Sequence, residues 1–536
     1  MPVFFLAWLV GGLLEPGDLG SSDVEHRLRV AHSLWTSDPQ VAPDDPDWTM
    51  PLGRDGLRRV HWGIGQSLVM LPADLVASAA LSFLALPETV EAKVRPALVG
   101  YLTFPLISAV GVVFAALVLR RLGFSERQSA VGGITLLFCT SLFPYTQIHQ
   151  ENTSLLLLDL IGFYGVLSWL KSRTGCYLAM TGAALGLSIL MRLTSVFDLA
   201  AITVFFVLIF FVAPGTMISK LHDFVAAFGK YVVPFVTIAF AVDRIYQFDR
   251  FGTWTDTYWD RVAHQVLAVH PEFPQNWPWI YPFWDGVYLI LISPERSISL
   301  FDPLLLVTVW ISLRYWQNLS WPVRSFAIAA ALLLGADVAI HARFYTPVGA
   351  AAWGSRFTTT PVILLSMLAA PLLLEVWILF SRLEKVLSII VIALATVVQL
   401  LSVPFWCQLE EAQMLDTGSG FVIGMRLINL LAIILNKFQD WHLASPNVAP
   451  RHLELNFAPF LIDKYIPLNL AHELQLVWSM AVVLALAAAV LLARLYFQFE
   501  RWQHQASAAS SRVDADAAPR LGGARFKAGR GRKNQE

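Results

Sequence analysis

The sequence has few charged residues, few cysteines and none of the common nucleotide- or metal-binding motifs. Only 14% of its 536 residues are charged, 56% are hydrophobic, and the mean hydropathy is +0.58. Its three cysteines cannot form a disulfide framework. No CxxC, HExxH, P-loop or GxGxxG pattern occurs, and the lack of a visible internal repeat disfavours a repeat-built transporter. Soluble proteins rarely have this composition, so the sequence predicts a membrane protein.

Apolar runs divide the chain into about twelve predicted transmembrane helices, because many runs approach or exceed the length that spans a bilayer. The first run, residues 2–14, lacks the basic start and the cleavage site of a signal peptide, so we interpret it as a short first span. The predicted fold class is therefore an all-α polytopic membrane protein. The other predicted spans are residues 97–119, 128–148, 153–170, 176–191, 195–213, 224–247, 299–313, 325–341, 361–380, 386–405 and 475–493.

Lysine and arginine gather in alternate loops, and this alternation predicts the orientation of the chain. With the basic loops on the cytoplasmic side, both termini are cytoplasmic. The basic loops contain Arg120, Arg121, Arg127, Lys171, Arg173, Lys220, Arg314, Arg324, Arg382 and Lys385. The predicted outer segments are residues 15–95, 249–298, 342–360 and 406–474.

Two apolar runs are not counted as spans. A crossing at residues 62–86 would place every later basic loop outside, so we interpret this run as a re-entrant or juxtamembrane helix. Residues 420–437 contain Arg426 and Asn429 and are predicted to form an interfacial helix. The expected organisation is a membrane domain over residues 1–497 and a basic, disordered cytoplasmic tail over residues 498–536, able to contact anionic lipid headgroups.

Residues 15–35 follow the first run and combine acidic residues with a helical pattern. Ser22 and Glu25 fit a capping box at the start of a helix. Asp23 stands in the first turn, where an acidic residue ordinarily complements the helix dipole; a catalytic role is the alternative. The pattern predicts an amphipathic helix lying on the membrane surface, with His26, Arg27 and Arg29 away from its apolar face. That face consists of Val24, Leu28, Ala31 and Trp35.

Ionisable residues gather near the predicted outer ends of the spans, and we expect them to surround a site on that face. Charges in a bilayer mark functional sites unless they reach the interface or form structural ion pairs. The aromatic-rich loop 252–282 indicates either an interfacial aromatic belt or a surface that contacts sugar or lipid. His149 and Glu151 are weak candidates for metal ligands. The gathered residues are Asp18, Asp23, Arg192, Asp198, Asp243, Arg244, Asp302, Asp337, His341, Arg343 and Arg356.

Four stretches resemble motifs of the GT-C-type glycosyltransferases, polytopic enzymes that use polyprenyl-phosphate-linked sugars. The chain is most similar to the bacterial dolichyl-phosphate-mannose–protein mannosyltransferase-like group, which includes lipid A aminoarabinose transferases, and the similarity covers residues 1–405. The stretches resemble, in chain order, the acidic motif with the first juxtamembrane helix, the second juxtamembrane segment, the second outer-loop motif and a late Arg-aromatic-x-x-x-Pro pattern. They are SSDVEHRLRVAHSLWTS, HWGIGQSLVMLPADL, PYTQIHQENTSLLLL and GSRFTTTPVILL.

The resemblance implies an inverting transfer in which Asp23 takes the proton of the acceptor hydroxyl. It also implies an arginine or lysine beside the donor phosphate, whose developing charge needs one. The candidates on the predicted outer face are Arg356, Arg192 and Arg343, and Arg356 ranks first because its motif resembles the family's. The sequence departs from the family where Val24 follows Asp23 in place of a second acidic residue, and where Glu151 replaces an aspartate that many relatives carry. Further candidate site residues are Asp18, His149, Glu151 and Asp337.

The implied function is transfer of a sugar from a polyprenyl-phosphate donor to a hydroxyl group on the outer or lumenal face. The acceptor, whether lipid, glycan or protein, stays open, and so does a need for a divalent cation. Expected surroundings are membrane lipids, in a bacterial plasma membrane or an endoplasmic reticulum, and no nucleic-acid partner is expected. Alternatives are a secondary transporter or lipid flippase, whose coupling charges ordinarily lie nearer the bilayer midplane, and a non-catalytic scaffold.

Overall fold

The computed structural model describes residues 2–41, 50–84, 87–212, 217–350, 352–418, 420–444, 446–449 and 453. The chain divides into two units, residues 1–486 and 487–536. The predicted span 475–493 and the predicted tail 498–536 lie outside the described residues. Within those residues the chain is helical, and pairing of the β type is confined to an isolated bridge between Leu52 and Arg58.

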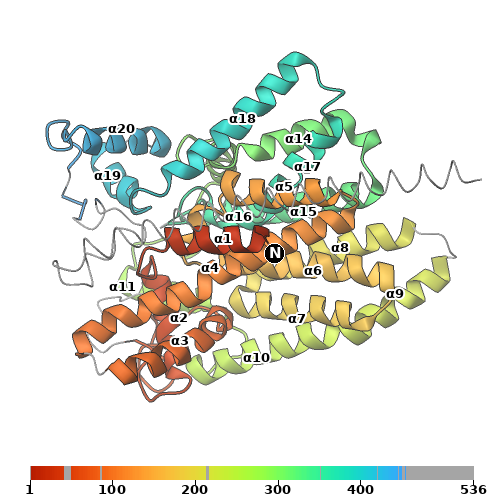
Figure 1. Ribbon diagram of the computed structural model, residues 1–536. Coiled ribbons are helices and arrows are strands. Elements are labelled where there is room, and N and C mark those ends of the chain that lie inside the picture. The colour runs from red at the N-terminus through yellow and green to blue at the C-terminus, as the bar shows by residue number, and fades with distance from the viewer. Residues whose placement is uncertain are drawn as a thin grey trace, which may run out of the picture. The chain divides into compact units, whose positions relative to one another are not determined.

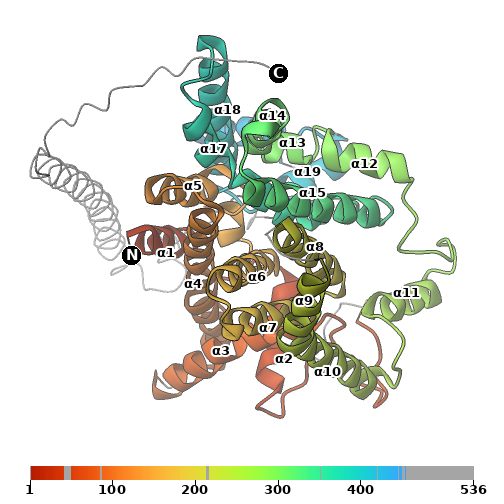
Figure 2. The same ribbon diagram turned by 90° about the vertical axis from the view of Figure 1, so that its right-hand side faces the viewer.

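Figures 1 and 2 show the helices, which mostly run side by side. The short 3₁₀ helices of the described residues are η1 (Pro144–Thr146), η2 (Leu193–Ser195), η3 (Trp316–Asn318) and η4 (Arg356–Thr358). The α-helices of the described residues are α1 (Pro2–Leu14), α2 (Ser22–Ser33), α3 (Gly65–Leu84), α4 (Glu88–Leu122), α5 (Glu126–Cys139), α6 (Asn152–Ser172), α7 (Gly175–Met191), α8 (Val196–Val212), α9 (Met217–Tyr231), α10 (Val233–Phe251), α11 (Tyr258–Val269), α12 (Phe283–Leu291), α13 (Ile298–Phe301), α14 (Leu304–Tyr315), α15 (Trp321–His341), α16 (Thr359–Ser366), α17 (Ala369–Val376), α18 (Arg382–Leu401), α19 (Leu409–Thr417) and α20 (Val422–Ile434).

Eight helical segments of the described chain are long and apolar enough to cross a membrane, and α1, α7 and α20 are shorter apolar helices. The prediction of an all-α polytopic membrane protein is therefore confirmed. Such a fold suits the apolar sequence because a helix satisfies its backbone polar groups internally, as a lipid environment requires. The eight segments are Gly65–Leu84, Val90–Leu122, Asn152–Ser172, Leu193–Phe210, Ile218–Phe251, Trp321–His341, Arg356–Val376 and Arg382–Leu401.

Two predicted spans are interrupted, and the interruptions meet each other. In the predicted span 128–148, α5 ends at Cys139 and the chain turns through η1. In the predicted span 299–313, α13 ends at Phe301 and α14 begins at Leu304, after Asp302 and Pro303. The Asp302 carboxylate accepts hydrogen bonds from the backbone N–H of Ser141 (2.7 Å) and from its hydroxyl. These bonds satisfy backbone that the breaks leave without helical partners.

The helix α2 is more deeply buried than the sequence predicts. It begins at Ser22 after the N-cap residue Ser21, whose side chain makes no capping bond, so the predicted capping box of Ser22 and Glu25 is wrong. His26 and Arg27 are buried, as are Val24, Leu28 and Ala31 of the predicted apolar face. Trp35 lies beyond the end of the helix, and its side chain is exposed.

The burial of α2 comes from packing on two sides. Val24, Leu28 and Ala31 pack with α3 residues, and on the other side Val30 packs with the segment that includes Val60. Periodicity of apolar residues shows only one of these two covered faces. The placement of α2 on the membrane surface stays a prediction.

The helix α3 occupies the run whose crossing the sequence left in question. It extends from Gly65 to Leu84 and includes Pro72 without ending there. By length and composition it belongs to the eight candidate spans, and it packs on α2 and α4. Figure 1 shows it beside α2. Its interpretation as a re-entrant or juxtamembrane helix stays a prediction.

Polar residues of the run 420–437 are buried against protein. Arg426 of α20 is fully buried and binds Glu410 of α19 at 2.5 Å and 2.6 Å. Asn429 donates to the same carboxylate at 3.0 Å. Polar groups that are satisfied in this way explain how an apolar helix carries an arginine and an asparagine without facing lipid.

Contacts join some of the basic loops to neighbouring loops. Arg173, after α6, stands 5.1 Å above the ring of Phe210 near the end of α8, and Arg314 of α14 pairs with Glu384 of α18 at 3.2 Å. The orientation of the chain stays a prediction.

We predict that the two ends label differently in intact cells. After Cys139, Cys176 and Cys407 are replaced, single cysteines at the exposed positions Glu272 and Arg127 test the outer and cytoplasmic ends. A membrane-impermeant thiol reagent added from outside should modify the cysteine at 272 and leave the one at 127 unmodified until the membrane is permeabilised. Modification at 127 in sealed cells contradicts the orientation.

Candidate active site

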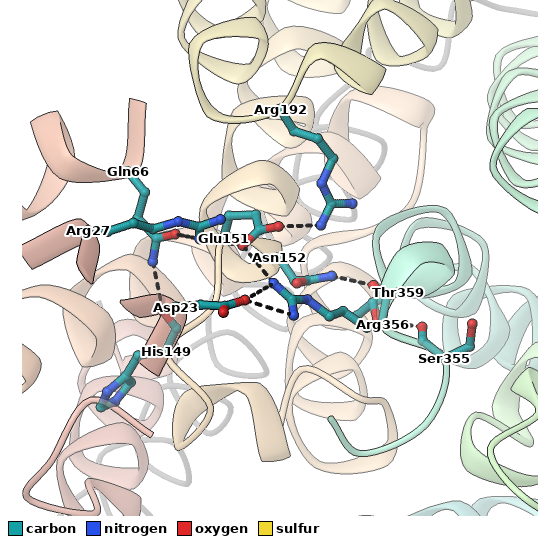
Figure 3. Close-up of polar contacts among 10 residues, drawn as sticks. All are labelled: Asp23, Arg27, Gln66, His149, Glu151, Asn152, Arg192, Ser355, Arg356 and Thr359. Atoms are coloured by element: carbon teal, nitrogen blue, oxygen red, sulfur yellow. Dashed lines mark hydrogen bonds and ion pairs between the residues drawn. The ribbon is translucent and has the colours of Figure 1, made fainter. Parts of the chain in front are cut away.

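Five charged side chains from distant parts of the chain meet near the ends of several helices (Figure 3). Asp23 and Arg27 belong to α2, and Glu151 precedes α6. Arg192 follows α7, and Arg356 begins η4. We call this set the charged cluster. Its three arginines and two carboxylates leave a net charge of one positive unit, which suits an anionic ligand.

Glu151 is the centre of the charged cluster. Its Oε2 atom lies 2.5 Å from Nη1 of Arg27 and 3.4 Å from Nη2 of Arg356, and its Oε1 atom lies 2.5 Å from Nη2 of Arg192. Only 5% of its side chain is exposed. Burial by itself raises the pKa of Glu151, but the three guanidinium charges and the hydrogen bond from Arg27 hold it well below its ordinary value. Glu151 is therefore ionised and bound to arginine through both oxygens.

Asp23 is the more accessible carboxylate of the charged cluster. Both contacts from Arg356, at 3.2 Å and 3.3 Å, reach its Oδ2 atom, and 27% of its side chain is exposed. It stands in the first turn of α2, where the helix dipole stabilises a negative charge. The two acidic residues thus differ in environment: Glu151 is enclosed by arginines, whereas Asp23 binds one arginine and stays open to a reactant.

Backbone contacts fix the position of Arg356. Its N–H donates to Val348 O at 2.9 Å, and its carbonyl accepts from Asn152 Nδ2 at 2.5 Å. Gly349 has a φ of +79°, and a Cβ atom there would stand 2.8 Å from Cβ of Arg356. Only glycine combines this conformation with so close an approach. Val348, Gly349 and Asn152 therefore hold Arg356 in place beside Glu151.

Gln66 of α3 ties three parts of the site together. Its amide nitrogen donates to His149 O at 2.7 Å, and its amide oxygen accepts from Arg27 Nη1. In the same motif, Gly63 and Gly65 pack against the backbone of residues 190–191, where an added Cβ would meet atoms at 2.3 Å and 2.5 Å. The stretch HWGIGQ thus lies directly beside Arg192 and supports Arg27.

Of the predicted site residues, Asp23, Glu151, Arg192 and Arg356 come together, and His149 lies behind them. His149 is fully buried, with Nε2 3.0 Å from Glu15 Oε2 and its ring stacked on Phe104. Asp18 stabilises a turn, since its Oδ1 atom accepts from Gly20 N at 2.9 Å.

Two predicted site residues lie outside the charged cluster. Arg343 is exposed after the end of α15, and in the described part of the chain no side-chain contact joins it to the five residues. Asp337 is buried one turn before His341, and none of its hydrogen bonds among the described residues reaches them. Position at the outer end of a span therefore did not suffice to identify a member.

The sequence analysis missed Arg27 and Gln66. Arg27 follows Asp23 by four residues, a spacing that places two side chains on the same face of a helix, and this signal was available. Gln66 stands in a stretch that resembled a family motif, but a glutamine in an apolar run gives no sign of its partners.

The structure separates the suggested metal pair. His149 is directed to Glu15, and both Glu151 oxygens contact arginine. Within the described ranges there is no group of three or more His, Cys, Asp or Glu residues placed to hold a metal ion. The question of a divalent cation stays as the sequence left it.

No protein-family model matches the sequence, and no curated protein matches it either. Among solved structures, the fold is similar to the oligosaccharyltransferase AglB from Archaeoglobus fulgidus in complex with an inhibitory peptide and a dolichol-phosphate. In this match the TM-score is 0.44 and the identity 14%, and it covers 85% of this chain and 61% of that chain. The apo form of an oligosaccharyltransferase from the same organism gives a TM-score of 0.44, 13% identity and the same coverage.

The apo structure of ArnT from Cupriavidus metallidurans gives a TM-score of 0.41 and 15% identity, over 90% of this chain and 74% of that chain. These proteins are GT-C glycosyltransferases, the class that the four sequence stretches resemble. At these TM-scores the matches add nothing to a functional assignment, so the function has to follow from the residues of the site.

We predict that Glu151→Gln destabilises the protein strongly. Removal of one partner of a buried ion pair costs about 3 to 5 kcal/mol, and here three arginines lose their shared carboxylate. Thermal unfolding of the purified variant in detergent measures the loss. The matched control is Asp440→Asn, which removes one partner of an exposed pair with Lys437 and should leave the melting temperature unchanged.

The direction of the pKa shift of Glu151 predicts how the stability difference between wild type and Glu151→Gln depends on pH. A carboxylate whose pKa is depressed in the folded state stabilises above its unfolded value, and this contribution is lost only as pH falls through the folded value. The gap between wild type and Glu151→Gln should therefore be constant from about pH 6 to 8 and narrow only under strongly acidic conditions. A gap that disappears near neutral pH contradicts the assignment of an ionised Glu151.

Proposed function

We propose that this protein is a membrane glycosyltransferase that moves a sugar from a polyprenyl-phosphate donor to an acceptor hydroxyl, with inversion at the anomeric carbon. The observation that carries the proposal is the Asp23–Arg356 pair: a partly exposed carboxylate bonded to an arginine inside a cluster with net positive charge. The reaction needs a base for a hydroxyl proton and a cationic site for a phosphate, and this pair supplies both.

In the proposed reaction the donor phosphate takes the place of Asp23 as the partner of Arg356. The carboxylate is then free to accept the proton of the acceptor hydroxyl as its oxygen forms a bond to the anomeric carbon. The bond from that carbon to the phosphate oxygen breaks, its electron pair stays on the oxygen, and polyprenyl phosphate leaves with one more negative charge. Arg356 and Arg192, supported by Arg27, stabilise this charge.

Glu151 has a different part in the proposal. Its oxygens are bound by arginine and its pKa is depressed, so it is a poor base. It serves instead as the counter-ion whose negative charge offsets the repulsion among the three guanidinium groups. Arg343, which lies outside the charged cluster, is left out of the proposed phosphate site.

The position of the charged cluster favours an enzyme over a secondary transporter or flippase. Arg192 and Arg356 stand at the ends of candidate spans, which begin at Leu193 and at Arg356 itself, rather than in their middle. Transporter sites commonly lie near the bilayer midplane. A site at the ends of apolar helices lets a prenyl chain stay in lipid while its phosphate reaches the arginines.

We predict that Asp23→Asn lowers turnover by about 10²-fold or more, the usual scale for loss of a general base. Asparagine keeps the shape of the side chain, so folding and donor binding should be nearly unchanged. Sugar transfer from a polyprenyl-phosphate donor in purified membranes gives the rate, and thermal unfolding of the same preparation gives the stability.

The control is Asp18→Asn, which alters a nearby acid outside the charged cluster and should cost less activity. Normal turnover in well-folded Asp23→Asn protein sinks the assignment of the base. Loss of stability with normal activity per folded molecule assigns Asp23 a structural role instead.

We predict further that Arg356→Lys weakens use of the donor, because a single ammonium group does not reproduce the two-pronged contact of a guanidinium with an anion. The apparent KM for the donor should rise, with the largest effect at limiting donor. Arg343→Lys is the matched control and should behave like wild type, since Arg343 is exposed and outside the charged cluster. Equal donor KM values for both variants show that the phosphate is held elsewhere.

A further inference from the structure

The outer loops place a group of aromatic rings beside the Asp23–Arg356 pair. Tyr345 follows α15, Trp259 is the second residue of α11, and Trp277 lies in the loop after α11. The Trp277 and Tyr345 rings are 5.2 Å apart and tilted by 33°, and Trp259 stands edge-on to both at 6.2 Å and 6.4 Å. We call these three rings the aromatic platform.

A buried ring anchors the aromatic platform to the charged cluster. Phe344 is only 3% exposed and contacts Trp259 at 4.8 Å and Tyr345 at 4.7 Å between ring centroids. It also meets Phe357, the residue after Arg356, at 5.4 Å. The guanidinium of Arg192 in turn stands 5.6 Å above the Phe357 ring. A continuous series of ring contacts therefore leads from the arginines to the aromatic platform.

The aromatic platform is accessible and electrostatically close to the proposed base. Tyr345 is 39% exposed, and Trp259 and Trp277 are half-buried. Burial raises the pKa of the Tyr345 hydroxyl, the charge of Asp23 raises it further, and Arg356 opposes these effects. Tyr345 thus lies within electrostatic range of both members of the pair.

We propose that the aromatic platform is the acceptor subsite and that the acceptor is a carbohydrate, whose ring lies on Tyr345 and Trp277 with a hydroxyl directed to Asp23. This inference rests on the proposed function. A pyranose presents C–H groups on its face, which the negative face of an aromatic ring attracts, and hydroxyls around its edge. Tyrosine and tryptophan suit such a ligand because each joins an apolar face to a polar group at the rim.

The surroundings favour a sugar over the two other kinds of acceptor. A lipid chain needs apolar surface without charge, whereas these rings connect through Phe344 and Phe357 to an arginine of the charged cluster. An extended peptide is commonly bound along the edge of a β-sheet, and the described outer segments offer only the isolated bridge between Leu52 and Arg58. The aromatic residues of loop 252–282 therefore have a use besides an interfacial belt.

Ligand-observed saturation-transfer NMR on the full chain in lipid nanodiscs tests the proposal without any need for turnover. The probes are methyl α-mannopyranoside, methyl β-glucopyranoside, methyl β-galactopyranoside and cellobiose. At least one should bind wild type, with saturation strongest on the C–H face of the ring. Trp277→Ala and Tyr345→Ala should weaken its binding about 2- to 10-fold, the scale of a lost aromatic contact.

Matched variants separate loss of the ring from loss of the fold. Trp277→Phe and Tyr345→Phe keep an aromatic face and should retain most of the binding. Trp284→Ala removes a 76%-exposed tryptophan of α12 that lies outside the aromatic platform and should bind like wild type. Failure of the base shows as normal turnover in Asp23→Asn, whereas failure of the subsite shows in the glycoside binding of the ring variants, so the two give different results.

Three outcomes overturn the inference. In the first outcome, no probe binds wild type, and in the second, the alanine variants bind a glycoside as wild type does. In the third outcome, farnesyl phosphate, a short prenyl probe, binds Trp277→Ala more weakly than wild type while glycoside binding is unchanged. That outcome assigns the rings to the donor's lipid chain.

Discussion

The site depends on one buried negative charge that is shared by three positive ones. A carboxylate as enclosed as Glu151 is costly unless it is paired, and so are guanidinium groups that stand side by side. Each therefore requires the others. Since Glu151 precedes α6 while its partners come from α2, from the end of α7 and from η4, their mutual pairing holds four segments together around one point. Gln66 extends this arrangement to α3.

This arrangement gives two acidic residues two different tasks. Glu151 has its oxygens occupied by arginine, and its pKa is depressed, so it organises the positive charge. Asp23 shares only Arg356, through one oxygen, and is open to a ligand. Active sites commonly assign different roles to neighbouring carboxylates by placing them in different environments. The proposed exchange of Asp23 for a donor phosphate on Arg356 uses this difference directly.

Aromatic residues of two loops pack against the segment that carries Arg356. Tyr345 and Phe357 flank the turn that carries Arg356, and Phe344 joins that turn to Trp259 of α11. The segment that carries the arginine and the rings are therefore in direct packing contact. A donor that engages Arg356 and an acceptor that lies on Tyr345 would meet at Asp23, which is the geometry that a direct transfer between two bound substrates needs.

The sequence by itself determined the class of fold. Only 14% of its residues are charged, its long apolar runs suit a membrane, and helices satisfy the backbone hydrogen bonds of such runs in lipid. Loop charge and motif resemblance also selected Asp23, Glu151, Arg192 and Arg356 as site candidates. Only the tertiary structure decided which charges touch. Arg27 looked like a surface residue because helical periodicity reports apolar faces and not buried ion pairs. Arg343 looked like a site residue because it lies in the same predicted outer segment as Arg356. Pairing is decided by the direction of each side chain and by partners more than a hundred residues away, such as Glu151 for Arg27 and Asp23 for Arg356. No local pattern contains that information.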